Sequence, residues 1–145
     1  TILLRPLLPS YIEQRRRMWQ KLLFIASFGG IGAVSRATAG QIKYSPATYE
    51  MLWEAMAEVK QVARARKIAM ASDALEQGIR FFDSLPYDAT ASMQRDIMEG
   101  RPSELEAQNG AVLRLGAEVN VDAPVHRFIY ASLIAAERKA RGELA

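Results

Sequence analysis

Lys21 is the residue in this sequence best placed to deliver a proton. It shares one face of a predicted helix with Met18, Ile25 and Phe28, because these residues recur at spacings of three and four. A lysine among apolar neighbours is partly desolvated, and desolvation disfavours its charged form, which suits a proton donor near neutral pH. The same pattern also fits a lysine at the edge of a core whose ammonium reaches water. The pattern alone leaves both interpretations open.

A second group of polar residues gathers within residues 91–124. Ser103 and Glu106 have the spacing of a capping box, which predicts a helix that begins near Glu104, where the helix dipole favours a carboxylate. Four apolar residues form the stripe of that helix: Leu105, Val112, Leu115 and Val119. Asn109 falls on this stripe. A buried amide needs a partner, so Asn109 either ties two helices together or faces a cleft.

Other polar and aromatic residues have simpler interpretations. Ser92 is a hydroxyl at a predicted helix start. Arg101 lies close to Asp96 and Glu99, which favours a structural ion pair over a phosphate contact. His126 is near the start of the last predicted helix and fits a surface or capping residue better than a ligand. Four aromatic residues are predicted to lie in the core: Trp19, Trp53, Phe128 and Tyr130.

Helical periods dominate the chain, and no segment shows the sustained alternation of a half-buried strand. Helix starts are indicated by Ser45-Pro46, by Asp73 and by Pro124. The predicted helices cover residues 11–28, 46–70, 73–82, 90–99, 104–119 and 124–141, with a short helical piece before Gly40. We therefore predict an all-α fold with six or seven helices.

Three glycines follow an apolar run in the first predicted helix. Gly29, Gly30 and Gly32 are expected to loosen or end that helix. The run superficially matches a dinucleotide fingerprint, with Glu50 as the ribose carboxylate, but such a fingerprint needs two flanking strands within about 30 residues. Ser35 takes the place of the third glycine, and no second strand follows. The glycines are therefore not expected to bind a dinucleotide.

Composition narrows the class of protein. The length of 145 residues suits one domain. The lack of cysteine argues against disulfides and favours a cytoplasmic location. Without cysteine and with a single histidine, a metal site is not expected. Basic clusters at residues 15–17, 64–67 and 138–141 fit solvated helix faces better than a nucleic-acid surface. The longest apolar run, residues 22–34, is too short to span a membrane. We predict no metal, no nucleic-acid partner and no membrane partner.

The stretch from Ser92 to Gly116 carries a longer pattern. Its fixed positions read Ser-Met-x-x-Asp-x-x-x-Gly-Arg-x-Ser-Glu-x-Glu-x-x-Asn-Gly-x-x-x-x-x-Gly. This pattern resembles the signature of the C-terminal domain of 2-dehydropantoate 2-reductase (ketopantoate reductase). The resemblance extends back through Trp19-x-Lys21 and forward to Pro124. Such a long ordered pattern is far more specific than a short motif.

The resemblance implies a fold and a reaction. Family members have an N-terminal Rossmann domain that binds NADPH and a C-terminal helical domain, like that of 6-phosphogluconate dehydrogenase-type reductases, that closes over a 2-oxo acid. This chain would supply the second domain over residues 11–145, with residues 1–10 as a linker or boundary segment. We expect it to be inactive alone. The expected reaction is the reduction of 2-dehydropantoate to pantoate in pantothenate biosynthesis.

The resemblance also implies roles for individual residues. Lys21 occupies the place of the general acid that protonates the carbonyl oxygen of the substrate. Ser92 occupies the place of a serine that contacts the substrate carboxylate, and Glu104 that of a glutamate that binds the substrate hydroxyl and helps to place the lysine. Asn109 is a further candidate for substrate binding, and the resemblance assigns no cofactor-binding residue within this chain.

Two positions depart from the family pattern. Ile25 and Gly29 stand one and two turns after Lys21, where ketopantoate reductases commonly carry asparagines. Loss of these amides suggests a related reductase for a different or bulkier 2-oxo acid, with Arg36 as the nearest cation that could compensate. An alternative of another class is a non-catalytic helical interaction module. Its exposed apolar face would be buried most simply in a homodimer.

Overall fold

The computed structural model describes residues 7–145, and all of the regular secondary structure in this range is helical. The helices are α1 (Leu7–Ser35), α2 (Ala39–Lys43), α3 (Pro46–Ala65), α4 (Ala74–Asp83), α5 (Ser92–Met98), α6 (Asn109–Ala117) and α7 (Pro124–Ala140). The predicted all-α fold with six or seven helices is confirmed. Residues 1–6 of the predicted linker lie outside the described residues, whereas residues 7–10 already belong to α1.

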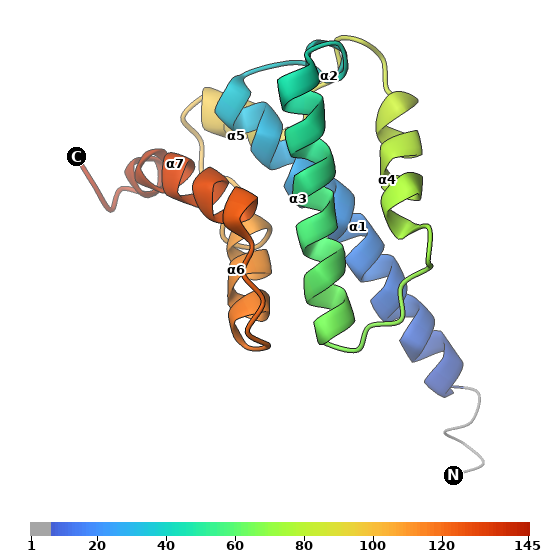
Figure 1. The fold of residues 1–145 in the computed structure, drawn as a ribbon. Helices are drawn as coiled ribbons and strands as arrows, with labels where there is room; N and C mark the ends of the chain where they lie inside the picture. Colours follow the sequence, from blue (N-terminus) through green and yellow to red (C-terminus); the bar gives the residue numbers. More distant parts are fainter. Residues whose placement is uncertain (1–6) are drawn as a thin grey trace.

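α1 is the axis of the fold. It is 29 residues long and packs against α3, α4, α5, α6 and α7. Figure 1 shows it running diagonally through the molecule, with α4 on one side and α6 and α7 on the other. Leu23 and Ala26 of its apolar run have no exposed surface, and Ile31 is almost fully buried. The apolar run therefore builds the centre of the core, as a buried helix.

The glycines of α1 do not end it, and the prediction that they would was wrong. The helix continues to Ser35 because neighbouring helices approach its backbone at these positions. A Cβ atom on Gly30 would lie 2.8 Å from Nδ2 of Asn109 and 2.9 Å from the side chain of Ile129, and one on Gly32 would overlap a side chain of α5. Close packing thus offsets the roughly 1 kcal/mol by which glycine disfavours a helix.

α6 begins at Asn109 and not near Glu104, so the predicted start of this helix was wrong. Residues 105–108 form turns, and Glu104 is a bend before them. The predicted capping box is absent because its two side chains have other partners. The hydroxyl of Ser103 binds the buried carboxylate of Glu137, and Glu106 binds side chains of α6 and α7. Tertiary contacts therefore override the local signal.

The helix starts predicted at Ser45-Pro46, Asp73 and Pro124 are confirmed to within a residue. The helices predicted to begin at residues 11 and 90 begin at Leu7 and Ser92. α3 ends at Ala65 and not near residue 70. The reason is that Lys67 adopts a left-handed conformation, with φ of 62°, which stops the helix.

The four aromatic residues that were predicted to lie in the core differ in their burial. Trp19 is buried, as predicted, and Trp53 and Tyr130 are partly buried. Phe128 is 58% exposed, so its placement in the core was wrong. Within residues 7–145, none of the helices is both long enough and apolar enough to span a membrane.

Candidate functional site

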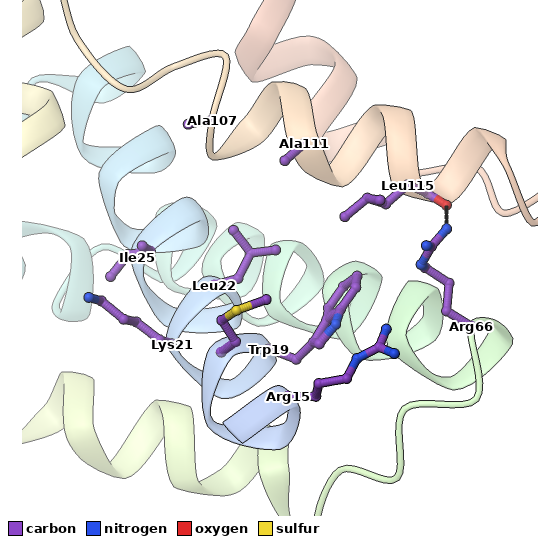
Figure 2. A pocket seen from close by; sticks show the side chains of 10 residues that line it. Arg15, Trp19, Lys21, Leu22, Ile25, Arg66, Ala107, Ala111 and Leu115 are labelled. Atoms are coloured by element: carbon purple, nitrogen blue, oxygen red, sulfur yellow. Dashed lines mark hydrogen bonds between the residues drawn. The ribbon is translucent and has the colours of Figure 1, made fainter. Parts of the chain in front are cut away.

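An open trough follows the uncovered face of α1, and we call it the α1 trough. It consists of three hollows that all include Ile25 in their lining. The α1–α6 hollow has a volume of about 410 Å³ and is drawn in Figure 2. The α1–α5 hollow has about 280 Å³ and the α1–α4 hollow about 610 Å³. Lys21 lines the first and third hollows, and Ser92 lines the second.

Lys21 is exposed in this structure. The prediction that its apolar neighbours within residues 7–145 partly desolvate it was therefore wrong. Figure 2 shows its side chain extending away from the indole of Trp19 along the open side of α1. Met18, which was expected to shield it, is itself 65% exposed. The described residues therefore leave the side chain of Lys21 open to solvent.

Ser92 lines the α1–α5 hollow, whereas Glu104 contacts a residue that lines it. Ser92 is the first residue of α5, and it is exposed at the rim of the hollow. Glu104 is exposed at the bend before the turns that lead into α6 and accepts a hydrogen bond from Nε2 of Gln108 at 3.2 Å. Gln108 lines the same hollow as Ser92. Gln108 thus connects the carboxylate of Glu104 to the hollow.

The positions that depart from the expected pattern also lie here. Ile25 is half-buried where the three hollows meet, and Gly29 is buried against Met93 and Gln108. Arg36 follows the end of α1, about 22 Å along the helix from Lys21 at 1.5 Å per residue. It is absent from the lining of all three hollows, so its compensating role was wrong.

Asn109 is fully buried, as its position on the apolar stripe predicts, and it ties helices together. Its Nδ2 donates to the carbonyl of Ala26 on α1 at 3.0 Å and to Nδ1 of His126 on α7 at 3.1 Å. Because Nδ1 of His126 accepts, the imidazole proton lies on Nε2, which donates to the carbonyl of Ala55 on α3 at 2.8 Å. Asn109 does not line the α1 trough.

His126 has no exposed surface, so the prediction of a surface residue was wrong. Burial lowers the pKa of His126 to about 4, and the ring is therefore neutral at pH 7. The carboxylate of Glu58 lies nearby and accepts hydrogen bonds from the backbone N–H groups of Val125 at 2.9 Å and His126 at 3.1 Å. Burial raises the pKa of Glu58, while these two hydrogen bonds act in the opposite direction. Glu58 thus caps the start of α7 from α3.

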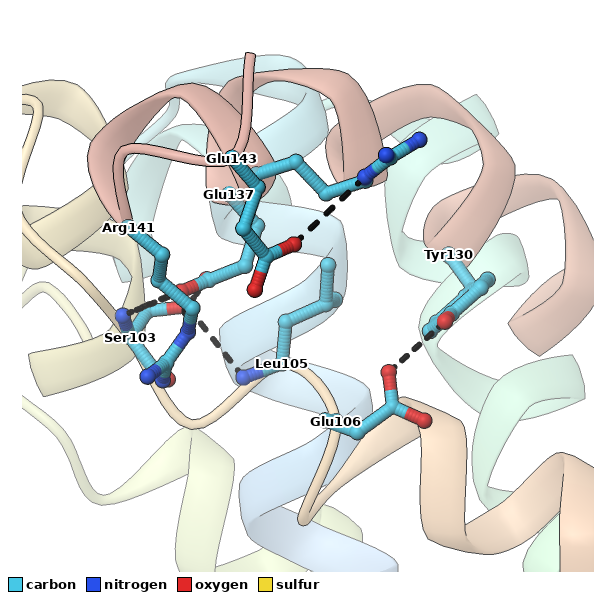
Figure 3. A network of polar contacts seen from close by, with 8 residues as sticks. Ser103, Leu105, Glu106, Tyr130, Glu137, Arg141 and Glu143 are labelled. Carbon is cyan, nitrogen blue, oxygen red and sulfur yellow. Dashed lines mark hydrogen bonds and ion pairs between the residues drawn. The ribbon is translucent and has the colours of Figure 1, made fainter.

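A second buried carboxylate anchors the segment that carries Glu104 (Figure 3). Glu137 accepts from the backbone N–H of Ser103 at 2.7 Å and from Nε of Arg141 at 3.0 Å. Arg141 also donates to the carbonyl of Ser103 at 2.8 Å. Ser103, just before the turns that lead into α6, is therefore held by Glu137 of α7 and by Arg141, which follows α7.

Arg101 is a structural residue. Its guanidinium pairs with Asp96 at 2.9 Å and also with Glu99, which confirms the predicted ion pair. In the part of the chain that the structure describes, no cluster of histidine and acidic residues could hold a metal ion.

Comparison with known proteins identifies the family. Residues 13–137 match the family described as ketopantoate reductase PanE/ApbA C terminal. The chain belongs to this family. The match covers the predicted site residues Lys21, Ser92 and Glu104 and every helix except the ends of α1 and α7.

Individual relatives of this ketopantoate reductase C-terminal domain are distant. It is 29% identical over 112 residues to 2-dehydropantoate 2-reductase of Pyrobaculum aerophilum, covering 77% of this chain and 40% of that protein. It is 26% identical over 127 residues to the uncharacterized oxidoreductase YkpB of Bacillus subtilis, covering 88% and 41%. A solved structure of a dimeric ketopantoate reductase from Staphylococcus aureus superposes with a TM-score of 0.81 at 25% identity, covering 87% and 44%. The chain thus spans about two fifths of the length of these relatives.

Sequence reasoning missed several residues that shape the site of this ketopantoate reductase C-terminal domain. Gln108 was missed although it lies three residues after Leu105 and four before Val112, on the same apolar stripe. Glu137 could have been found, because it continues a helical row formed by His126, Ile129 and Leu133. A polar residue on such a row carries the same requirement for a partner that singled out Asn109.

Proposed function

We propose that this chain is the substrate domain of an NADPH-dependent 2-oxo acid reductase, with 2-dehydropantoate as the expected substrate and pantoate as the product. The observation that carries the proposal is the α1 trough. Lys21 lines the α1–α6 and α1–α4 hollows, and Ser92 and Gln108 line the α1–α5 hollow. Gln108 donates to the carboxylate of Glu104, and together these positions support the proposal. A small organic acid needs such a combination of an apolar wall and a few convergent polar groups.

The proposed roles follow from the chemistry of each group. Lys21 donates a proton to the carbonyl oxygen of the substrate as that oxygen gains negative charge. Ser92, at the rim, donates a hydrogen bond from its hydroxyl group to the substrate carboxylate. Glu104 accepts a hydrogen bond from a substrate hydroxyl, because an ionised carboxylate can only accept. Asn109 acts indirectly in this proposal, since its hydrogen bonds hold α6 against α1 and α7.

The cofactor fits a separate domain better than this chain. Residues 7–145 contain no strand, and the glycines 29, 30 and 32 lie inside α1 against other helices, so no strand-turn-helix cradle for a dinucleotide exists there. We therefore assign NADPH to an N-terminal Rossmann domain. When bound there, it would supply the hydride, while residues of this chain bind the acid, orient it and hold the proton.

The exposed apolar surface supports a covering domain. Met18 is 65% exposed in the α1–α6 hollow, and Phe81 is 55% exposed in the α1–α4 hollow. A domain that closes over these residues would also desolvate Lys21, which strengthens its interaction with a developing negative charge. Assembly of the whole enzyme as a homodimer is part of the same proposal.

Steady-state kinetics of the full-length reductase that carries this chain test the proposal. Lys21→Ala should lower kcat by about a hundredfold or more, the usual contribution of a general acid. Lys139→Ala is the matched control, because Lys139 is an exposed lysine at the end of α7, and it should stay within about twofold of the wild type. A Lys21→Ala enzyme with wild-type kcat on 2-oxo acids would refute the assignment of Lys21 as the general acid.

A further inference from the structure

Four phenylalanine rings form a row that leads from the core to the α1–α4 hollow. Phe82 and Phe28 are buried, and their ring centroids lie 5.6 Å apart. The ring of Phe28 lies 5.6 Å from that of Phe24, and the ring of Phe24 lies 4.6 Å from that of Phe81, nearly perpendicular to it at 85°. Phe81 is 55% exposed, so the row ends with a ring that is still largely open to solvent.

The open end of this row belongs to the candidate site. Phe24 and Phe81 both line the α1–α4 hollow, and Lys21 lines it as well. Lys21 and Phe24 are three residues apart on α1, a spacing that places their Cβ atoms about 5–6 Å apart on one face of the helix. Phe24 and Ile25 also line the α1–α5 hollow, which has Ser92 at its rim. A ligand that Ser92 and Lys21 hold therefore has an aromatic wall beside it.

The α1–α4 hollow offers more room than a short aliphatic side group needs. Its volume is about 610 Å³, against about 280 Å³ for the α1–α5 hollow. Aromatic rings pack edge-to-face or offset-stacked, with centroids about 4.5–7 Å apart, and the contacts within the row have distances of 4.6–5.6 Å. An aromatic ring on the ligand would continue the row and cover the open ring of Phe81.

Two polar side chains in the lining of the α1–α4 hollow already have partners within the chain. Arg17 pairs with Glu13 on its own helix at 3.7 Å. Nε2 of Gln20 donates to the carbonyl of Ala74 on α4 at 2.9 Å. The hollow therefore suits an uncharged apolar side group better than a second carboxylate.

We propose that the site also reduces aromatic 2-oxo acids, with the aromatic side group seated in the α1–α4 hollow against Phe24 and Phe81. This inference rests on the proposed function and adds a class of substrate to it. The carbonyl carbon of the acid gains a hydride from NADPH, which is oxidised to NADP⁺, and the carbonyl oxygen gains a proton from Lys21. The product is the corresponding 2-hydroxy acid.

The test compares phenylpyruvate with pyruvate on the full-length reductase that carries this chain, because the two acids differ only by the phenyl ring. Burial of the ring should make kcat/KM for phenylpyruvate at least about tenfold higher than that for pyruvate. Phe81→Ala removes the open end of the row and should lower the ratio of the two values by about fivefold. Phe128→Ala is the matched control, because Phe128 is 58% exposed on α7 and lines none of the three hollows, and it should leave the ratio within about twofold.

The ratio of the two kcat/KM values is independent of the folded fraction, because both acids are measured on the same preparation. If Phe81 packs only against a covering domain, its loss lowers both values and leaves the ratio unchanged, which overturns the inference. Should Phe81→Ala fail to fold, Phe81→Leu keeps an apolar side chain without the ring, and the ratio should fall in the same direction.

Two results with the wild type would also overturn the inference. One is equal kcat/KM for phenylpyruvate and pyruvate, and the other is a higher kcat/KM for 2-oxoglutarate, whose second carboxylate the hollow does not suit. Reduction of 2-oxo acids without a preference for the aromatic one refutes this inference alone, whereas failure with every 2-oxo acid refutes the proposed function.

Discussion

The neutral buried imidazole of His126 makes the stability of this chain depend on pH in a defined way. The ring accepts from Asn109 through Nδ1, so protonation would destroy that hydrogen bond and place a charge in the core. Burial lowers the pKa of His126 from 6.5 to about 4. The stabilisation is therefore fully present above pH 6.5 and is lost as the pH falls toward 4.

The size of the effect follows from linkage between proton binding and unfolding. A shift from 6.5 to about 4 corresponds to about 3 kcal/mol of stability at neutral pH, of which about 2 kcal/mol is already lost at pH 5. Glu58 acts in the opposite direction, because its raised pKa favours the folded state as the pH falls. A comparison between wild type and a variant at position 126 cancels the contribution of Glu58.

His126→Gln is the informative variant, since a glutamine amide can accept from Asn109 and donate to the carbonyl of Ala55 without a titrating group. Urea unfolding of both proteins should be measured between pH 7.5 and pH 5. The free energy of unfolding of the wild type should fall by about 2 kcal/mol more than that of the variant over this interval. Parallel pH profiles would refute the assignment of a neutral buried imidazole.

Four further substitutions, two at glycines of α1 and two at polar side chains, are tested by the same unfolding assay. Gly30→Ala should destabilise the fold by about 1–3 kcal/mol through overpacking, because its Cβ would lie 2.8 Å from a buried amide. Gly29→Ala meets its neighbours at 3.4 Å or more and should be neutral or stabilise by up to about 1 kcal/mol, so equal effects at both glycines would contradict the packing argument. Glu137→Ala should cost about 2 kcal/mol, because it leaves the buried N–H of Ser103 without an acceptor. Arg101→Ala, which breaks exposed ion pairs, should stay within about 0.5 kcal/mol, and a larger loss there than at Glu137 would show that the anchor is misassigned.

Local signals predicted the helices well where the cause is local. Pro46 and Pro124 occupy the first turns of α3 and α7, because proline lacks only an N–H that the first turn leaves free. The family signature in residues 92–116 likewise marked the segment that carries Ser92 and Glu104. These helix starts and this signature depend on residues that are close together in the sequence, so they can be recognised from the sequence alone.

The predictions that were wrong concern residues whose environment depends on tertiary contacts. The hydroxyl of Ser103 binds Glu137, which lies 34 residues further along the chain, so the predicted capping box had a competitor that no local pattern reveals. Lys21 was expected to be shielded by its own helix face, but shielding of that face depends on what lies across from it. His126 could have been placed correctly, since it shares a helical row with Ile129 and Leu133, and a polar residue on an apolar row is usually buried and paired.

Turnover by the full-length protein and by the isolated chain tests the central claim most directly. Oxidation of NADPH should be followed with 2-dehydropantoate and a panel of other 2-oxo acids. The account predicts saturable reduction of at least one of these acids by the full-length protein and no turnover by the 145-residue chain alone. Failure of the full-length protein to reduce any 2-oxo acid would contradict it, and so would turnover by the isolated chain.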